Sequence, residues 1–228
     1  MEIKEIEEKV EMMTAPFAEF ADITVEEKLA FLWFNQYSGF CIRSGDATVV
    51  VDPVEVEVEE IAASSPDLAL ISHEHFDHFD GEIVEGLEDV CEIATNKTVA
   101  DELDFEPWVL TPGDSLKQEG VKVTVLKSEH PGEEPLTILL EFGERNVYHA
   151  IDSKPHEGME GLNPDVLIVP IGIAPGVSAR TGIEITRLAK PKVVIPHHSK
   201  QGFEEFASGV RDARVVKPER GEIFTCEV

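Results

Sequence analysis

The stretch Ile71-Ser72-His73-Glu74-His75-Phe76-Asp77-His78-Phe79-Asp80-Gly81 decides how this chain is interpreted. It follows an apolar run over residues 68–72 that predicts a buried strand. His73 and His75 are two residues apart, so an extended backbone points both imidazoles to the same side. A lone histidine is usually structural. Three histidines and one aspartate within six residues of a strand end instead predict a site for divalent metal ions.

Short β-rich runs separated by Gly and Ser turns predict the strands around this motif. The predicted strands cover residues 31–34, 39–43, 47–52, 68–72, 91–94, 109–110, 121–127, 136–142, 147–151, 166–170, 193–196 and 223–226. The predicted helices cover residues 82–86, 97–103, 183–189 and 203–210. Runs of strands are each followed by helix, without strict βα alternation. The pattern therefore favours an α+β fold, a four-layer αββα sandwich, over a doubly wound parallel sheet.

Residues 1–30 are predicted to form an N-terminal helical extension, and residues 31–228 a single domain. Apolar residues recur at helical spacing over residues 1–13, which predicts an amphipathic helix. Thr24 and Glu27 have the spacing of a capping box and predict a short helix to about Ala30. The first helix can pack on its own domain or serve as an interaction element. In the second case, the expected partner is another copy of this chain in a homo-oligomer.

The composition narrows the expected partners and compartment. The 228 residues carry 19 Lys and Arg against 46 Asp and Glu, a formal net charge of -27. Such a surface repels phosphate backbones and anionic membranes, so neither nucleic acid nor a membrane is an expected partner. Cys41, Cys91 and Cys226 are odd in number and lack a CxxC pair, which indicates reduced thiols and a cytoplasmic location. A charged N-terminus without an apolar core segment predicts no secretory signal.

The pattern H-x-H-x-D-H, with Gly81 three residues later, resembles the signature of the metallo-β-lactamase superfamily. Further segments are similar to family motifs in the same order along the chain. They are Ser128-Glu129-His130, Tyr148-His149-Ala150-Ile151-Asp152-Ser153, Val169-Pro170-Ile171-Gly172 and Ile195-Pro196-His197-His198. The later segments resemble those of small metal-dependent hydrolases related to ascorbate-6-phosphate lactonase. The resemblance covers roughly residues 31–226.

The resemblance implies a metal-ligand set, with two divalent ions expected. It assigns one ion to His73, His75 and His130, a second ion to Asp77, His78 and His198, and a bridging role to Asp152. Zinc is favoured, although these ligands also suit manganese and iron. His198 aligns with the family's histidine, whereas its neighbour His197 aligns with a variable residue and remains the alternative ligand.

Three segments depart from the family pattern. Ile151 replaces a glycine before the bridging aspartate, and Ser153-Lys154 replaces Thr-Gly. Near the first strand, Asn35-Gln36-Tyr37 stands where the family often has Gly-His. Because these positions border the substrate, the resemblance does not transfer a substrate to this chain.

Several residues near the motif have a structural and a functional interpretation. By resemblance, Asp52 supports the metal loop through hydrogen bonds, and the alternative is a simple strand-end turn. Glu74 should point away from the two histidines and is expected to be structural or solvated. His149 should face away from Asp152 and is expected in the core or behind the ligands. His156 is expected in a loop near the site, either as a surface histidine or in contact with substrate.

The predicted function is a metal-dependent hydrolase that uses a metal-bridging hydroxide on a small ester, lactone, amide or phosphoester. Asp77 is the predicted catalytic residue, because it would orient the hydroxide or take up its proton. The alternatives are a metal-dependent nuclease or phosphodiesterase of the same fold and a non-catalytic metal-binding protein. A redox di-iron centre is disfavoured, since flavodiiron proteins place glutamate where this chain has His75.

Overall fold

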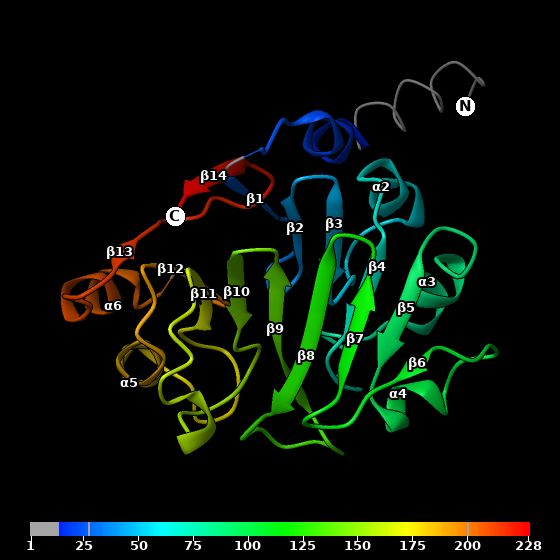
Figure 1. Ribbon diagram of the computed structural model, residues 1–228. Coiled ribbons are helices and arrows are strands. Elements are labelled where there is room, and N and C mark those ends of the chain that lie inside the picture. The colour runs from blue at the N-terminus through cyan, green and yellow to red at the C-terminus, as the bar shows by residue number, and fades with distance from the viewer. Residues whose placement is uncertain (1–13, 27, 200) are drawn as a thin grey trace.

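In a computed structural model, which describes residues 14–26, 28–199 and 201–228, two sheets pack face to face (Figure 1). The first sheet has the order β14 (Ile223–Glu227), β1 (Lys28–Trp33), β2 (Phe40–Ser44), β3 (Ala47–Val51), β4 (Leu68–Ile71), β5 (Glu92–Thr95), β6 (Trp108–Val109). The second has the order β13 (Arg214–Val215), β12 (Val193–His197), β11 (Val166–Pro170), β10 (Arg145–His149), β9 (Leu136–Phe142), β8 (Val121–Lys127), β7 (Ser115–Gln118).

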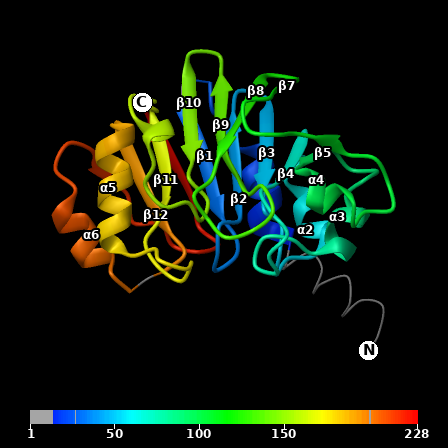
Figure 2. The same ribbon diagram turned by 90° about the horizontal axis from the view of Figure 1, so that it is seen from below.

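Helices cover the outer faces of both sheets (Figure 2). Those beside the first sheet are α2 (Val58–Ala63), α3 (Gly81–Gly86) and α4 (Lys97–Ala100), together with a helix over residues 14–22. Those beside the second sheet are α5 (Ala179–Ala189), α6 (Phe203–Gly209) and the short 3-10 helix η1 (Glu157–Met159). The molecule therefore has helix, sheet, sheet and helix layers.

Alternation along single strands explains why the layers form. On β1, Leu29 and Phe31 point into the core between the two sheets, whereas Ala30 and Leu32 pack beneath the helices. On β11, Ile168 faces the same inter-sheet core, and its neighbours Leu167 and Val169 pack under α5 and α6. Because both faces of these strands are buried, their sequences are almost wholly apolar.

The predicted four-layer αββα sandwich is confirmed, and every predicted strand has a counterpart. The helix expected from Thr24 to about Ala30 is wrong, because β1 begins at Lys28 and pairs on both sides with β14 and β2. Tertiary pairing outweighs the local capping signal there. Helix α2 and strands β7 and β13 were not predicted. The helix predicted for residues 1–13 lies outside the described residues, and the domain division at residue 30 stays a prediction.

The topology brings the ends of several strands to one edge of the sandwich. β1, β3 and β4 run in one direction in the first sheet, as do β8, β10 and β12 in the second. The amide of Leu136 donates to the carbonyl of Ser72, which joins the two sheets at this edge. It is the lower edge in Figure 1, where β8 ends. Every segment of the candidate site follows the end of one of these strands.

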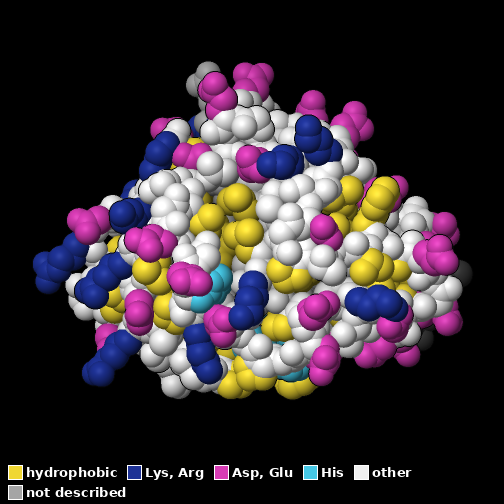
Figure 3. Space-filling model, turned by 60° about the horizontal axis from the view of Figure 1, so that its bottom comes forward, with side chains coloured by type: hydrophobic (Ala, Val, Ile, Leu, Met, Phe, Trp, Pro, Cys, Tyr) yellow, Lys and Arg dark blue, Asp and Glu magenta, His cyan; other side chains and the backbone are white. Residues whose placement is uncertain are grey.

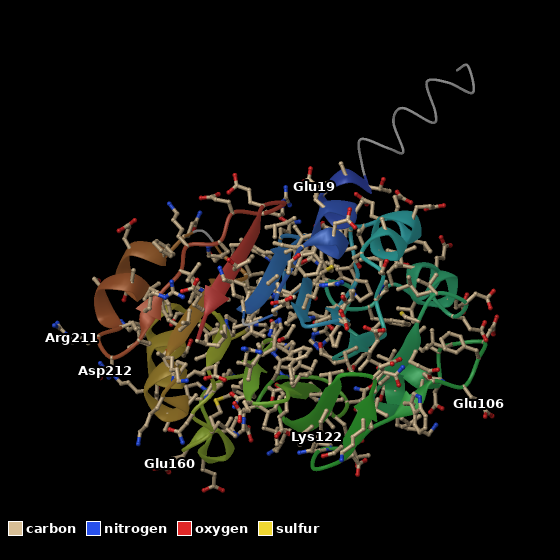
Figure 4. All side chains as sticks on the ribbon, turned by 45° about the horizontal axis from the view of Figure 1, so that its top comes forward. Glu19, Glu106, Lys122, Glu160, Arg211 and Asp212 are labelled. Atoms are coloured by element: carbon tan, nitrogen blue, oxygen red, sulfur yellow. The ribbon has the colours of Figure 1, made fainter. Side chains whose placement is uncertain are left out.

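Charged side chains surround the sandwich. Glu19, Glu106, Glu160, Arg211 and Asp212, labelled in Figure 4, lie at the periphery and are exposed. In the part of the chain that the structure describes, no helix is long and apolar enough to cross a membrane. Cys41, Cys91 and Cys226 are free thiols.

Candidate metal centre

Two groups of potential metal ligands meet at the lower edge. The first contains His73, His75 and His130, and the second contains Asp77, His78, Asp152 and His198. Within each group, one ligand atom from every residue lies within 4.8 Å of all the others. The structure thus brings together all seven residues that the resemblance implied, from four separate loops.

The histidines of the first group converge through their ring nitrogens. His75 Nδ1 lies 3.1 Å from His73 Nε2 and 3.2 Å from His130 Nε2. A tetrahedral ion with metal–nitrogen bonds of about 2.0–2.1 Å separates its ligands by about 3.3 Å. The spacing therefore fits one ion held by three imidazoles.

Hydrogen bonds behind the first group fix the tautomer of His73. The hydroxyl of Ser72 donates to Asp52 Oδ2 at 2.9 Å and lies 2.9 Å from His73 Nδ1. Because that hydroxyl proton already goes to the carboxylate, Nδ1 of His73 must donate to Ser72. Its Nε2 is left with a free lone pair directed at the other two imidazoles.

Asp152 lies between the two groups. Its carboxylate oxygens are 2.9 Å from His198 Nε2, 3.3 Å from His78 Nε2 and 3.7 Å from His130 Nε2. Asp77 Oδ2 completes the second group at 3.8 Å from His78 Nε2 and 3.9 Å from His198 Nε2. A single carboxylate therefore faces ligand atoms of both groups.

Asp52 orients the second group from behind. Its Oδ2 accepts from His78 Nδ1 at 2.7 Å and from the Ser38 hydroxyl at 2.6 Å, and its Oδ1 accepts from the Ser72 amide at 2.8 Å. Asp52 and His78 are fully buried. Since Nδ1 of His78 is used, its Nε2 must point into the site. The supporting role expected for Asp52 is confirmed.

Electrostatics separate the histidines into two classes. Burial, together with the nearby His78, holds the pKa of His73 well below 6.5, and burial likewise lowers the pKa of His130. Burial also disfavours the charged form of His78, but Asp52 and Asp152 outweigh it and raise its pKa to about 10. Burial opposes ionisation of Asp152, yet His198 and His78 hold its pKa below the usual carboxyl range. His73 and His130 are thus neutral at pH 7, whereas the carboxylates of Asp52 and Asp152 favour the charged form of His78.

The residues present fit a bound metal. Buried Nε2 atoms of His78 and His198 and Oδ1 of Asp152 have no hydrogen-bond partner among the described residues. Orphaned polar atoms at this depth are costly unless something binds them. Imidazole nitrogens and carboxylate oxygens are ligands that zinc, manganese and iron accept.

His198 and His197 point in different directions at the end of β12. His198 has a left-handed backbone, with φ of 66°, and its ring joins the second group. His197 instead lies against the loop after β1, with Nδ1 3.3 Å from the Tyr37 carbonyl. The structure therefore places His198, and not His197, where the sequence analysis expected the ligand.

Other residues singled out from the sequence have structural positions. Glu74 accepts from the Glu133 amide at 2.9 Å and ties the metal loop to the loop after β8. His149 is fully buried, accepts from the Ile151 amide and donates to the Ser38 carbonyl, so the expectation of a core histidine is confirmed. His156 caps η1, where its Nδ1 accepts from the Gly158 amide.

A hydroxyl after β10 aligns the loops of His130 and Asp152. Ser153 Oγ accepts from the Glu129 amide at 2.9 Å, and the Lys154 amide donates to the Glu129 carbonyl at 3.2 Å. Serine keeps a hydroxyl where the family motif has threonine. The roles of Ser38 and Ser72 were missed by sequence reasoning, because their partner Asp52 lies far along the chain and no local pattern marks them.

Comparisons with known proteins agree with this geometry. A family model described as "Beta-lactamase superfamily domain" matches residues 32–198. The chain belongs to the metallo-β-lactamase superfamily. A "UPF0173 protein" of Pyrococcus abyssi is 27% identical over 196 residues, covering 77% of this chain and 89% of that protein. A "UPF0173 metal-dependent hydrolase" of Thermoplasma acidophilum is 26% identical over 201 residues, covering 75% of this chain and 84% of that protein.

A solved structure shares the fold of this superfamily member. It is Igni18, described as a novel metallo hydrolase from the hyperthermophilic archaeon Ignicoccus hospitalis. It aligns with a TM-score of 0.77 at 22% identity and covers 88% of this chain and 99% of its own. At that identity the similarity establishes the architecture alone.

Proposed function

We propose that this chain is a hydrolase that depends on two divalent ions. The observation that carries the proposal is the position of Asp152, whose carboxylate faces both the His73 group and the His78 group. The description of the Thermoplasma acidophilum relative as a metal-dependent hydrolase supports the hydrolase part of the proposal. Zinc is the favoured ion, and manganese and iron suit the same ligands.

The bound ions would supply Lewis-acid polarisation of the substrate and a lowered pKa for the attacking water. The chain's own residues would hold and orient the reactants. Asp52 and Ser72 keep the imidazoles of His78 and His73 in the tautomers that bind metal. This preorganisation leaves no ligand to be rearranged during the reaction.

Asp77 is the residue proposed to move a proton. Its side chain is 14% exposed, whereas that of Asp152 is 3% exposed, so substrate and water reach Asp77 more readily. Its carboxylate can accept a proton from the attacking water and donate it to the leaving group. His156, which caps η1, is a weaker candidate for the second step.

The proposed substrate class is a small ester, lactone, amide or phosphoester, converted in the cytoplasm. The three free thiols suit a reducing compartment. Nucleic acid is not proposed as a substrate, because the net charge of -27 opposes approach of a phosphate backbone.

Metal analysis of wild type and Asp152→Ala tests the proposal directly. Protein purified without chelator should hold up to two ions per chain, and Asp152→Ala should lower occupancy at both groups. Full metal content in the Asp152→Ala protein would refute the shared carboxylate. A panel of esters, lactones, amides and phosphoesters, with single- and double-stranded DNA and RNA included, then tests the substrate class. Metal-dependent cleavage of nucleic acid that His75→Ala abolishes would favour the nuclease alternative.

A further inference from the structure

Four large hydrophobic side chains are exposed among the described residues, and one lies inside the metal loop. Phe76, between His75 and Asp77, is 82% exposed, and Ile173, after β11, is 62% exposed. The other two, Trp108 and Val109, form the short strand β6. Single exposed apolar residues are common on protein surfaces. The exposure of Phe76 alone does not indicate a binding site, so its neighbours must be considered.

A second aromatic ring, that of Tyr37, lies beside Phe76. The two rings are edge to face, with centroids 6.4 Å apart and planes at 84°. The Tyr37 ring also meets the imidazole of His198, with centroids 5.5 Å apart and planes at 64°. We call Tyr37 and Phe76 the aromatic wall. It borders the metal centre on the side of the second group.

The loop between β1 and β2 holds the backbone of Tyr37 firmly. Asn35 is 1% exposed, and its Oδ1 accepts from the amides of Tyr37 and Gly39. Its Nδ2 donates to the carbonyls of Asp52 and Val54. All four hydrogen-bonding positions of this buried amide are thus used, and the loop is fastened to the strand end that carries Asp52.

Two further contacts fix the Tyr37 carbonyl. It accepts from Trp33 Nε1 at 2.9 Å and faces His197 Nδ1 at 3.3 Å. A Cβ at Gly39 would lie 2.2 Å from Asn35 Nδ2, so only glycine leaves room for this arrangement. His197 therefore supports the backbone of Tyr37 from the end of β12, next to the candidate ligand His198. The backbone that carries the Tyr37 ring is therefore preorganised, and binding does not have to order this loop.

Acidic side chains lie along the opposite side of the metal centre. Glu74 is hydrogen-bonded to the loop of His130, and Glu133 and Glu134 of that loop are exposed. Beside the aromatic wall, Glu55 accepts from Gln36 at 2.8 Å. Figure 3 shows histidine side chains at the surface of this edge among hydrophobic, acidic and basic ones. Two divalent ions would themselves attract an anionic group, so these carboxylates bear on the part of the substrate that lies away from the ions and favour an uncharged group there.

We propose that the aromatic wall selects the substrate, which is a neutral ester, lactone or amide with a flat apolar group next to the bond that is cleaved. The inference rests on the proposed function, and it narrows that function to one class of substrate. The flat group would lie against Tyr37 and Phe76, while the carbonyl reaches the two ligand groups. Aromatic contacts of this kind contribute about 0.5–1.5 kcal/mol each beyond area burial.

Hydroxamic acids test the wall without depending on turnover, because they bind metal through a common group. The dissociation constants of benzohydroxamic acid and acetohydroxamic acid are measured by calorimetry on the metal-loaded protein. Their ratio isolates the effect of the benzene ring. Phe76→Ala and Tyr37→Leu should each reduce the wild-type preference for benzohydroxamic acid by about 2- to 10-fold. Adding a carboxylate, as in 4-carboxybenzohydroxamic acid, should weaken binding.

Two control variants separate the wall from general effects. Trp108→Ala removes an exposed aromatic ring on β6 and should leave the ratio unchanged. Tyr37→Phe keeps the ring and should retain the preference that Tyr37→Leu loses. If Phe76→Ala and Tyr37→Leu both kept their metal and the wild-type ratio of dissociation constants, the aromatic wall would not select the substrate. The hydrolase proposal would be unaffected by that result. A chain that takes up no metal and binds neither compound would overturn both.

Discussion

His78 Nδ1 lies 2.7 Å from Asp52 Oδ2, and both side chains are fully buried. The two residues come from the ends of neighbouring parallel strands, β4 and β3. Asp52 needs a left-handed backbone, with φ of 47°, to turn its carboxylate under the metal loop. The same carboxylate holds Ser72, which in turn sets the tautomer of His73. One residue therefore prepares ligands of both groups.

Asp52→Asn tests this relationship while preserving shape. The amide places an N–H or a weaker acceptor against His78, so the imidazole loses its fixed orientation. Metal affinity should fall by about 10- to 100-fold, as for other groups that orient ligands. Competition with a chromophoric chelator measures it. Asp67→Asn is the matched control, because Asp67 accepts from the Thr48 amide at the other end of the same strand pair. Equal affinities in the two variants would contradict the role of Asp52.

The adjacent histidines at the end of β12 should behave differently. His198→Ala removes a ring that lies 2.9 Å from Asp152 and should lower metal occupancy of the second group. His197→Ala should leave metal content nearly intact, because its ring faces the Tyr37 carbonyl. Elemental analysis of the two variants side by side measures the difference. Metal loss in His197→Ala with retention in His198→Ala would reverse the assignment.

Ile151 combines a buried side chain with an unfavourable backbone. It is 1% exposed and has φ of 49°, a conformation that disfavours β-branched residues. Ile151→Ala and Ile151→Gly should both destabilise the fold, by about 2–5 kcal/mol for the lost side chain. The glycine variant should be the more stable of the two by about 1 kcal/mol, because it relieves the left-handed strain. Urea unfolding of the metal-free protein measures both values.

A buried strand position provides the contrast to Ile151. Val147 lies within β10 and is fully buried. There the order should be reversed, with Val147→Ala more stable than Val147→Gly, since glycine weakens a strand interior. If alanine were the more stable replacement at both positions, backbone strain at Ile151 would be negligible.

The sequence predicted the parts of the site that follow from local spacing. His73, His75, Asp77 and His78 stand in one short motif after a buried strand, and their convergence required only the alternation of that strand. The preference for His198 over His197 rested on resemblance and on the opposite directions of neighbouring residues. The later ligands His130 and Asp152 came from resemblance alone, because no local rule brings β8 and β10 to the same ion.

What the sequence did not predict depends on contacts between distant residues. The helix expected to end near Ala30 does not form, because Leu29 pairs in a β-sheet with Cys226, a residue almost two hundred positions away. Helix α2 was missed because its N-cap is Glu57, outside the usual Ser, Thr, Asp and Asn set. The support of Tyr37 by Asn35 and His197 also escaped notice, since an asparagine in a loop is ordinarily a turn residue.

His149 predicts a pH dependence of stability. Burial lowers its pKa from 6.5 to about 4, and the neutral ring hydrogen-bonds Ile151 and Ser38. Between those values the unfolded chain binds a proton that the folded chain does not. Stability should therefore fall as the pH drops from 6.5 towards 4, by about 3 kcal/mol from this residue. Urea unfolding of metal-free wild type and His149→Gln across this range measures it. A variant with the wild-type slope would contradict the assignment.

Asp77 should matter for the chemical step more than for metal retention. It stands 3.8 Å and 3.9 Å from the nearest nitrogens of His78 and His198, further than Asp152 does, and it is the more exposed carboxylate. Asp77→Asn keeps an oxygen ligand and removes the group that accepts the proton. Its kcat on a confirmed substrate should fall by about 100-fold or more, at the low end for general acid–base groups, with KM less affected. Asp80→Asn is the matched control, because Asp80 only caps α3 and asparagine caps equally well. Metal content is measured on the same samples, so that loss of an ion is not mistaken for loss of proton transfer. Wild-type turnover by fully metal-loaded Asp77→Asn would mean that the attacking water needs no help from this carboxylate.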